Sequence, residues 1–534
     1  MTAFPAPAPG LSDEAVDDVA ALLPEWLATQ CQLRRQSGVQ VALWHEGELV
    51  TEIAAGWADE PAGIPLRTDH RLRIASHSKM FTALAILRLQ EEGRLRLDDT
   101  LGEHVGELAD TPVADRTLRD LLSHAAGLTR DSDDARWWRL GIPFADREAL
   151  LGIARTGAVR TEPGLHLQYS NIGYGLLGLV IEELTGQSYA EAVSALVLDP
   201  VDVPELGPDL PADAPGPEAD GGFAAGHTSL LHGPRRVVEQ VPTGALAAAT
   251  GFWASAGAIA RFAGEVLAGG ALLSPRSLRE MRRRVWTLDD GSQYGLGLQE
   301  GHLHGFAAVG HSGGFPTGLS RTWAVPTEHL AVSVIGTSVD FPSSELAHGI
   351  LGLLALAAGR PAPSAERWER AGAQGGASDG RERPAVLDAQ DGVRLTDRDG
   401  ATGDAAPAEA DDVLLTAAEV ADLVSGSYDS LWGRTRLAVL GGRLFALDET
   451  LADPAASALE LRVGGVRRDP ISSELRTIEL ATWGDAGYRS WAEPILARIG
   501  HLEGAGLRCV GLVVTGQVLT PTAEFTMPER VLAP

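Results

Sequence analysis

The alternation of hydrophobic and polar positions predicts strands near both ends of the first two thirds of the chain. Residues 39–57 (VQVALWHEGELVTEIAAGW) alternate on either side of Glu46-Gly47, which is typical of a β-hairpin. Residues 294–337 return to a strand pattern, whereas the segment between follows mostly helical spacing, most clearly from Met80 to near Gly93. Strands at both ends with helices between them predict one α+β domain whose antiparallel sheet joins the two ends.

The pattern changes after this region and then resumes. Residues 361–413 are rich in Ala, Gly, Asp, Glu, Arg and Pro, which predicts a flexible linker. A short helix is expected over 415–424, followed by short strands, the first pair turning at Gly441-Gly442. Short strands of this kind predict a small antiparallel β-barrel. We therefore expect a first domain over residues 12–360, the linker, and a barrel over 414–534.

Composition and charge narrow the classes of function. Hydrophobic residues make up 44% of the chain, which is enough for sizeable cores. The formal net charge of −28 argues against nucleic acid and anionic membranes as partners. The two cysteines, Cys31 and Cys509, lie far apart, so neither a disulfide scaffold nor a cysteine zinc site is expected. No signal-peptide pattern and no long apolar run appear, so we expect a cytoplasmic protein.

Lys79 is the only lysine in 534 residues, although lysine and arginine together number 44. A preference for arginine explains the missing lysines but not the position of the one that remains. It follows Ser76 by three positions in IASHSKMFTA, which puts the amine and the hydroxyl one helical turn apart. A desolvated lysine can lose its proton and act as a base, which arginine cannot do. The alternative is a helix-capping serine beside a surface cation.

Two further segments carry polar groups of chemical interest. Tyr169 and Asn171 precede a strongly apolar helix in LQYSNIGYGLLGLVIEELTG. A tyrosine can pass a proton and an asparagine can orient a substrate amide, but an ordinary turn explains the same pattern. Residues 311–314 (HSGG) lie within a strand pattern, where glycines permit close approach of a ligand. A bulge with an exposed histidine is the alternative there.

Together, the ordered motifs SHSK, YSN and HSG resemble the serine β-lactamase and penicillin-binding-protein family, over roughly residues 35–358. The stretches RTLRDLLSHAAGLTR and ATGFWASAGAIARFA are also similar to that family. The resemblance implies that Ser76 is the acylated nucleophile, Lys79 its base or electrostatic partner, and Tyr169 the proton shuttle to the leaving group. It implies an oxyanion site between the backbone N–H groups of Ser76 and Gly314. The implied substrate-binding and oxyanion residues are Asn171, His311, Ser312, Gly313 and Gly314.

The resemblance also suggests a branch of the family. His311 replaces the second lysine of class C β-lactamases, and histidine is only partly charged near neutral pH, so a β-lactam carboxylate should be recognised weakly. His-x-Gly resembles D-aminopeptidases, some DD-peptidases and related esterases. A lipocalin-like barrel after such a domain resembles D-aminopeptidases, D-stereospecific peptidases and the cyclising thioesterases of peptide assembly lines. We therefore expect a serine hydrolase acting on small amides or esters, with peptides containing D-amino acids as the expected class.

Two alternatives remain open. One is transfer of the acyl group to an amine, as in an acyltransferase or a cyclising thioesterase. The other is a non-catalytic ligand-binding or assembly protein, against which the intact Ser76, Lys79 and Tyr169 argue. No cofactor and no metal are expected, and the oligomeric state is left open. His124, in LLSHAAGL, is expected to be a structural histidine that bonds backbone, and Trp137-Trp138 to pack rather than line a cleft.

Overall fold

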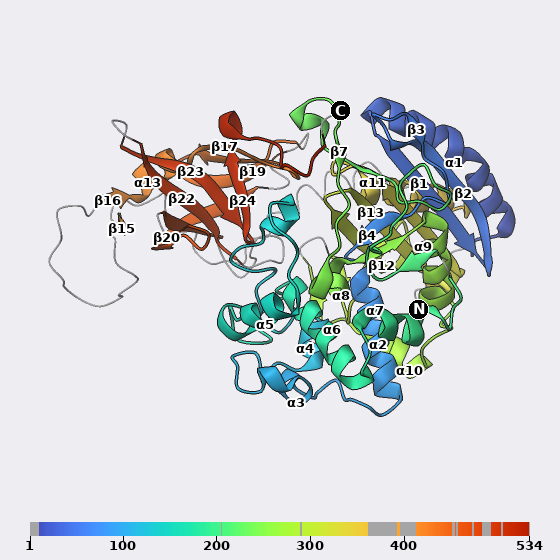
Figure 1. Cartoon of the computed structure of the whole chain (residues 1–534). Coiled ribbons are helices and arrows are strands. Elements are labelled where there is room, and N and C mark those ends of the chain that lie inside the picture. Colours follow the sequence, from blue (N-terminus) through green and yellow to red (C-terminus); the bar gives the residue numbers. More distant parts are fainter. Residues whose placement is uncertain are drawn as a thin grey trace, which may run out of the picture. The chain divides into compact units, whose positions relative to one another are not determined.

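In a computed structural model, the chain forms two compact units (Figure 1). The residues that the structure describes are 10–203, 205–288, 291–360, 392–395, 413–450, 454, 458–472, 475–482, 493–502 and 506–532. The first unit takes residues up to Leu128, from Pro143 to the predicted linker, and from Glu529 on; the second takes Thr129–Ile142 and the rest up to Pro528. Of the predicted linker, Gly392–Leu395 (β15) and Val413 lie within the described residues, and β15 is paired with β16 (Val413–Thr416).

A nine-stranded antiparallel sheet forms the centre of the first unit, in the order β3-β2-β1-β14-β13-β12-β11-β10-β9. β1 pairs with β14, with Val39 opposite Gly336, so the predicted joining of the two ends is confirmed. The predicted hairpin is confirmed as well, since Glu46 and Gly47 have φ values of 49° and 97°, as a tight hairpin turn requires. The strands are β1 Gly38–His45, β2 Glu48–Asp59, β3 Ile64–Pro65, β9 Trp286–Thr287, β10 Gln293–Tyr294, β11 Gln299–Leu303, β12 Phe306–Phe315, β13 Gly318–Val325 and β14 Leu330–Gly336.

One face of this sheet is covered by the first and the last helix of the unit, α1 (Asp13–Arg34) and α11 (Ser343–Ala357). Each helix contributes an apolar stripe at helical spacing to a shared core with the strands. The buried residues of these stripes are Val16, Val19, Leu23 and Leu27 in α1, and Leu346, Ile350, Leu351 and Leu354 in α11. Among the described residues, no helix has both the length and the apolar character needed to cross a bilayer.

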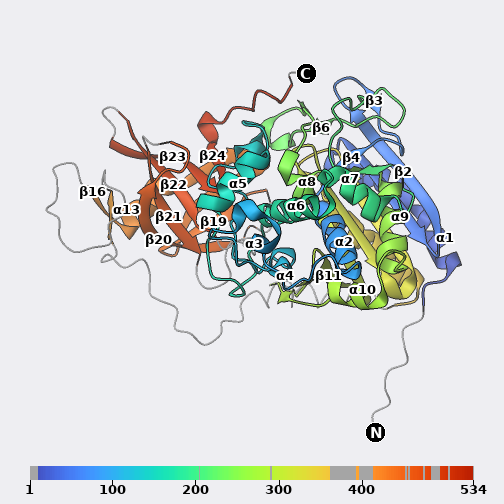
Figure 2. The same ribbon diagram turned by 60° about the horizontal axis from the view of Figure 1, so that its bottom comes forward.

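The helical region between β2 and β9 surrounds one central helix, α2 (Ser78–Glu91) (Figure 2). Eleven of its residues are buried, so it is apolar nearly all round, as an enclosed helix must be. The predicted helix is thereby confirmed, although it begins after Ser76 rather than at it. The other helices of the region are α3 Leu101–His104, α4 Leu118–Leu122, α5 Arg147–Thr156, α6 Asn171–Thr185, α7 Tyr189–Val193, α8 Ala247–Thr250, α9 Ala256–Phe262 and α10 Pro275–Met281.

The second unit contains the predicted barrel, a closed antiparallel ring of eight strands drawn in orange to red in Figure 1. Apolar side chains of the strands form its core, to which helix α13 (Ala417–Val424) adds Val420, Ala421 and Val424. A capping box joins Thr416 and Glu419 at the start of this helix. The strands are β17 Gly426–Ser430, β18 Gly433–Leu440, β19 Arg443–Asp448, β20 Leu459–Arg468, β21 Arg476–Thr482, β22 Ile495–Leu502, β23 Gly506–Val514 and β24 Gln517–Pro521.

Residues 129–142 belong to the barrel unit although their neighbours in sequence belong to the other. The backbone N–H of Ala135 donates to the carbonyl of Gly516 at 2.8 Å, and the indole N–H of Trp432 donates to the carbonyl of Trp138 at 3.0 Å. Gly516 has a φ of +76°, and a Cβ there would lie 2.1 Å from the Ser132 carbonyl oxygen. Only glycine permits this approach. Trp137 and Trp138 are both buried, in keeping with the packing role expected for them.

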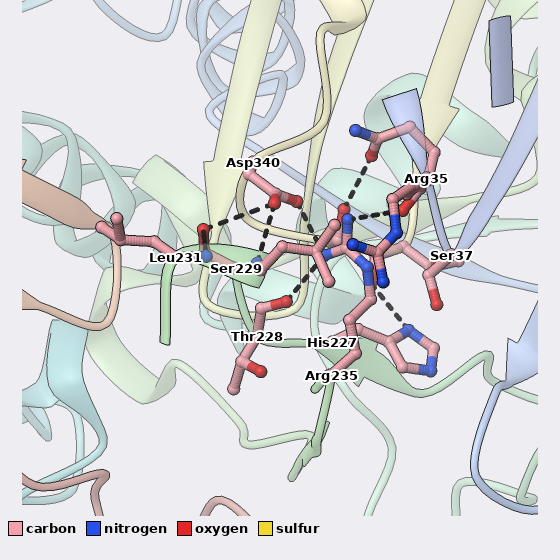
Figure 3. Close-up of polar contacts among 12 residues, drawn as sticks. Arg35, Ser37, His227, Thr228, Ser229, Leu231, Arg235 and Asp340 are labelled. Carbon is pink, nitrogen blue, oxygen red and sulfur yellow. Dashed lines mark hydrogen bonds and ion pairs between the residues drawn. The ribbon is translucent and has the colours of Figure 1, made fainter. Parts of the chain in front are cut away.

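The C-terminal tail, from Glu529 on, follows the barrel in sequence but belongs to the first unit. The N–H of Leu532 donates to the carbonyl of Val237 at 2.9 Å, which places the tail beside β7 (Val237–Val238), the partner of β6 (Gly226–His227). A buried polar network supports this hairpin (Figure 3). In it, the Arg235 guanidinium donates to the carbonyls of Thr228 and Arg35 and to the Asp340 carboxylate, at 2.7, 3.0 and 2.8 Å.

Candidate active site

Ser76 lies in the tight turn between β4 (Leu72–Ala75) and α2, just ahead of the first helical N–H groups. The turn is entered through Ala75, which has a φ of +45°, a strained value for a residue with a Cβ. The hydroxyl of Ser78 holds the turn, since it donates to the Ala75 carbonyl at 2.6 Å and accepts the N–H of Phe252 at 3.0 Å. The serine is thus presented, half-buried, at a helix N-terminus, where unpaired N–H groups favour negative charge.

Lys79 is fully buried, and its amine points at the serine. Its Nζ lies 3.3 Å from the Oγ of Ser76, 2.8 Å from the Oδ1 of Asn171 and 2.9 Å from the carbonyl oxygen of Ala249. The alternative of a surface cation beside a capping serine is therefore wrong, because the N-cap of α2 is His77 and its side chain makes no cap bond. The structure brings the predicted amine and hydroxyl together in an enclosed site.

The YSN motif supplies one wall of this site. The Tyr169 ring centre lies 4.6 Å from the Nζ of Lys79, within the range of a cation–π contact, and Asn171 is the first residue of α6. Ser170 caps that helix, with its Oγ accepting the N–H of Gly173 at 2.8 Å. The motif is therefore both the turn before a helix and a source of side chains that reach Lys79.

The HSG segment lies on β12, where the strand extends beyond one of its neighbours. β11 pairs with β12 only from Phe306 to Gly310, whereas β13 pairs with it through Phe315. Over the described residues, no strand pairs with positions 311–314 on the β11 side. An unpaired strand edge of this kind can bind an extended ligand through its backbone.

The glycines of this segment answer a steric demand, and the register excludes the predicted alternative. A Cβ at Gly313 would lie 2.0 Å from the Ile74 carbonyl oxygen, so β4 packs against the strand at a distance that only glycine allows. The β12–β13 register runs without a shift from Val309 to Phe315, and His311 is buried. The alternative of a bulge with an exposed histidine is therefore wrong.

His311 is a neutral histidine rather than a partly charged one. Its Nδ1 lies 2.6 Å from the Ser312 carbonyl oxygen, and its Nε2 lies 3.2 Å from the hydroxyl of Tyr294. Burial holds the pKa of His311 well below its usual value. The sequence suggested partial charge because burial of a single strand residue cannot be judged from its type. Ser312 contributes to the site through its backbone carbonyl, which bonds to the imidazole of His311.

Sequence analysis did not single out His77, which lies next to Ser76 within the motif. Its Nδ1 lies 2.8 Å from the Ile74 carbonyl oxygen, and its Nε2 lies 3.0 Å from the Thr322 hydroxyl of β13. Burial lowers the pKa of His77 to about 3, so this ring is also neutral. The imidazole therefore joins the turn that holds Ser76 to the sheet.

His124 and Tyr294 complete the polar surroundings. The Nδ1 of His124 accepts the backbone N–H of Ser170 at 3.0 Å, which confirms the expected backbone bond, and its Nε2 lies 3.2 Å from the Tyr294 hydroxyl. The His124 ring centre is 4.2 Å from that of Tyr169. Tyr294 was missed as a site residue, although it opens the YGLG stretch. Within the described parts of the chain, no three His, Cys, Asp or Glu side chains gather as a metal site would require.

Comparison with known proteins agrees with this geometry. The family model named Beta-lactamase matches residues 26–357, which is more than half of the chain and includes every residue of the candidate site. The chain belongs to the Beta-lactamase family. Relatives by sequence include the esterase EstB of Burkholderia gladioli, 34% identical over 187 residues, which are 33% of this chain and 47% of that protein. Protein flp of Staphylococcus aureus strain MW2 is 30% identical over 169 residues, 31% of this chain and 33% of that protein. The chain thus matches about half or less of these relatives' length.

Solved structures of the same fold extend the similarity beyond the region that the family model matches. The octameric penicillin-binding protein homologue of Pyrococcus abyssi aligns over 91% of this chain and 96% of its own, with a TM-score of 0.56 and 20% identity. SurE aligns over 95% and 99%, with a TM-score of 0.54 and 22% identity. The D-stereospecific amidohydrolase of a Streptomyces species aligns over 61% and 94%, with a TM-score of 0.51 and 21% identity. At these identities the likeness is one of fold.

Proposed function

We propose that this member of the family hydrolyses small amides or esters through an acyl-enzyme on Ser76. The observation that carries the proposal is the 3.3 Å approach of the buried Lys79 amine to the Ser76 hydroxyl. A serine hydroxyl is a weak nucleophile until an adjacent base takes its proton, and this amine lies within reach of doing so. A non-catalytic role would leave the burial of this amine against a serine without a purpose.

The Lys79 amine donates to Asn171 Oδ1, the Ala249 carbonyl and the Ser76 hydroxyl, as an ammonium would. A neutral amine fits the same three partners, because the hydroxyl, unlike the other two oxygens, can also donate. A neutral amine has two N–H bonds for the two acceptors and one lone pair for the serine proton. Lys79 is therefore proposed as the base for acylation, and Asn171 as the residue that holds it in place while its amide group orients the substrate.

The reaction then proceeds in two balanced halves. The Ser76 Oγ bonds to the substrate carbonyl carbon as its proton passes to the Lys79 and Tyr169 pair, and the oxyanion forms between the N–H groups of Ser76 and Gly314. The bond to the leaving amine or alcohol breaks as Tyr169 returns the proton to it. A water molecule next attacks the acyl carbon, its proton passes to the same groups, and the Ser76 oxygen leaves with a proton.

The proposed substrate class is a peptide-like amide or ester containing a D-amino acid. The edge of β12 at residues 311–314, beyond the end of its pairing with β11, suits an extended acyl chain. Structures of similar fold include a D-amino acid amidase of Ochrobactrum anthropi with D-phenylalanine and SurE with D-Leu, and the esterase EstB is a relative by sequence. Transfer of the acyl group to an amine is the second candidate, because an acyl-enzyme serves both reactions.

Intact-protein mass spectrometry tests the proposal. The protein is mixed with matched D- and L-amino-acid amides, methyl esters and thioesters, and we expect a mass gain equal to the acyl group, mapped to Ser76 and absent in Ser76→Ala. Dilution into buffer with and without an amine then separates hydrolysis from transfer. Acylation at another residue while Ser76 stays unmodified would disprove the assignment, and heat-unfolded protein serves as the control for chemical labelling.

A further inference from the structure

A chain of hydrogen bonds runs from α6 to β12, and its donors and acceptors fix its direction when both of its histidines are neutral. At one end, the backbone N–H of Ser170 donates to the Nδ1 of His124 at 3.0 Å. A nitrogen that accepts carries no proton, so the neutral ring of His124 has its proton on Nε2. That Nε2–H lies 3.2 Å from the Tyr294 oxygen and donates to it.

The other end fixes the second histidine in the opposite tautomer. The Ser312 carbonyl can only accept, so the Nδ1 of His311, at 2.6 Å, must carry the proton. The Nε2 of the neutral ring is then an acceptor, and the Tyr294 hydroxyl, 3.2 Å away, donates to it. With His311 neutral, Tyr294 thus accepts from one histidine and donates to the other, and its hydroxyl also bonds to that of Tyr174.

We propose that Tyr294 is a positioning residue that keeps His311 neutral with both ring nitrogens occupied, so that the site favours acyl groups without a carboxylate at this point of β12. The proposal deepens the function proposed above and rests on it for the identity of the acyl group. Its structural half, the tautomers of the two histidines, rests on the hydrogen-bond chain together with the burial of His311.

The other charged or titratable groups facing His311 do not offer a free cation for a carboxylate. From α2, Lys79 is bonded to Asn171 and Ala249, and the adjacent His77 is neutral. From β13, Arg321 donates to the Gln299 side chain at 2.5 Å and stacks 3.6 Å from the Trp323 ring. The remaining groups are the hydroxyls of Tyr169 and Tyr294 and the ring of His124.

Removal of one oxygen atom should release this constraint. In Tyr294→Phe, the Nε2 of His311 loses its donor and becomes open to water and to a proton, whereas the ring packing is kept. Tyr174→Phe is the control, because it removes another buried tyrosine hydroxyl, one that donates to the Leu122 carbonyl at 2.6 Å and bonds to the Tyr294 hydroxyl but not to His311. Tyr294→Phe loses its bonds to both His124 and His311, so the titration of His311 itself, rather than a general loss of stability, is the quantity to compare.

Histidine-selective ¹⁵N NMR of the full chain tests the tautomers without any need for turnover. In the wild type and in Tyr174→Phe, we expect the His311 signal to show a protonated Nδ1 and a bare Nε2, with no titration between pH 8 and 5.5. In Tyr294→Phe, we expect His311 to titrate within this range. At pH 5.5, N-acetyl-D-alanine should then shift the His311 signal of Tyr294→Phe only, and N-acetyl-D-alanine amide should shift none.

Kinetics with a neutral and an anionic ester of the same alcohol, an acetate and a hemisuccinate, tests the selectivity. We expect the anionic-to-neutral ratio of kcat/KM to rise about tenfold in Tyr294→Phe at pH 5.5 and to change little at pH 8 or in Tyr174→Phe. A His311 signal with a protonated Nε2 in the wild type, or identical titration in both variants, would overturn the proposal. Absence of acylation at Ser76 would refute the proposed function instead, and the NMR titration with the carboxylate would still decide the role of Tyr294.

Discussion

The Oδ1 of Asn171 accepts a hydrogen bond from the Nζ of Lys79 at 2.8 Å, across 92 positions of the sequence. This bond ties the first residue of α6 to the first turn of α2 and fixes which end of the amide faces the amine. A carboxylate in the same place would instead hold a proton on the lysine, because an opposite charge nearby favours the charged form.

Asn171→Asp should therefore lower the acylation rate at pH 7 by roughly 10²–10⁴-fold, the usual range for loss of general-base action. Part of the loss should be recovered at pH 9 to 10, where the amine can release its proton. Stopped-flow measurement of acylation by an activated ester checks both points, with Asn171→Leu as the uncharged control of similar size. If the Asp variant shows the same pH dependence as the Leu variant, Lys79 does not act as the base.

Lys79→Arg should be nearly as damaging as Lys79→Ala, with a loss of roughly 10²–10⁴-fold in kcat/KM. Arginine keeps the positive charge, but it cannot accept the proton of Ser76. The comparison of the two variants on one ester, at equal thermal stability, separates proton transfer from electrostatics. Retention of most activity by the Arg variant would mean that a fixed charge is enough.

Benzylpenicillin should be a poor substrate. Its carboxylate would approach the part of β12 where His311 is neutral and bonded at both nitrogens, so no cation compensates its desolvation. Loss of β-lactam absorbance, measured beside the hydrolysis of a simple ester, gives the comparison. Turnover of the penicillin at the rate of the best ester would contradict the description of this site.

Acid should destabilise the fold through its buried histidines. Burial lowers the pKa of His77 to about 3, whereas the unfolded chain has a value of about 6.5. Between these pH values the unfolded state binds a proton at His77 and the folded state does not. The contribution of His77 to the free energy of unfolding is therefore fully present above pH 6.5 and is lost as the pH falls towards 3. The slope is about 1.4 kcal/mol per pH unit for one such histidine. Urea unfolding at pH 7.5 and 5 should show a smaller loss for His77→Gln than for the wild type, and equal losses would count against a neutral His77.

Gly516→Ala should destabilise the barrel unit by more than Gly506→Ala. Both glycines have a left-handed φ, +76° and +77°, so each alanine meets a similar backbone cost of about 1–2 kcal/mol. Only at Gly516 would the new Cβ also collide with the Ser132 carbonyl, at 2.1 Å, whereas nothing lies within 4 Å of it at Gly506. Proteolysis of residues 129–142 and denaturant unfolding together measure the difference, and equal effects would show that the approach to Ser132 is not needed.

The sequence predicted the parts of the site that depend on local spacing. Ser76 and Lys79 are three positions apart, in the turn that leads into α2 and in the first turn of that helix, so short-range geometry brings their side chains together. The hairpin at Glu46-Gly47 likewise follows from a short-range pattern. Tyr294 could not be predicted in the same way. Its two histidine partners lie 170 and 17 positions away, and no local signal specifies which ring its hydroxyl meets.

Neither the charge of His311 nor the packing partners of residues 129–142 could be predicted from the sequence, for related reasons. The pKa of a histidine depends on how deeply the folded chain covers it, which its residue type does not reveal. The segment DDARWWRL shows two tryptophans that must be buried somewhere, but the pattern does not tell whether the cover comes from the helices next to it or from strands hundreds of residues later.

The attachment of residues 129–142 to the barrel also has a consequence for the order of events during translation. Arg139 donates to the carbonyl of Val518, a residue synthesised 379 positions later. At about 5–20 residues per second, the ribosome needs roughly 20–75 seconds to cover that distance. Throughout this interval, Trp137 and Trp138 lack the strands that finally bury them, and they remain open to chaperones and to contacts with other nascent chains.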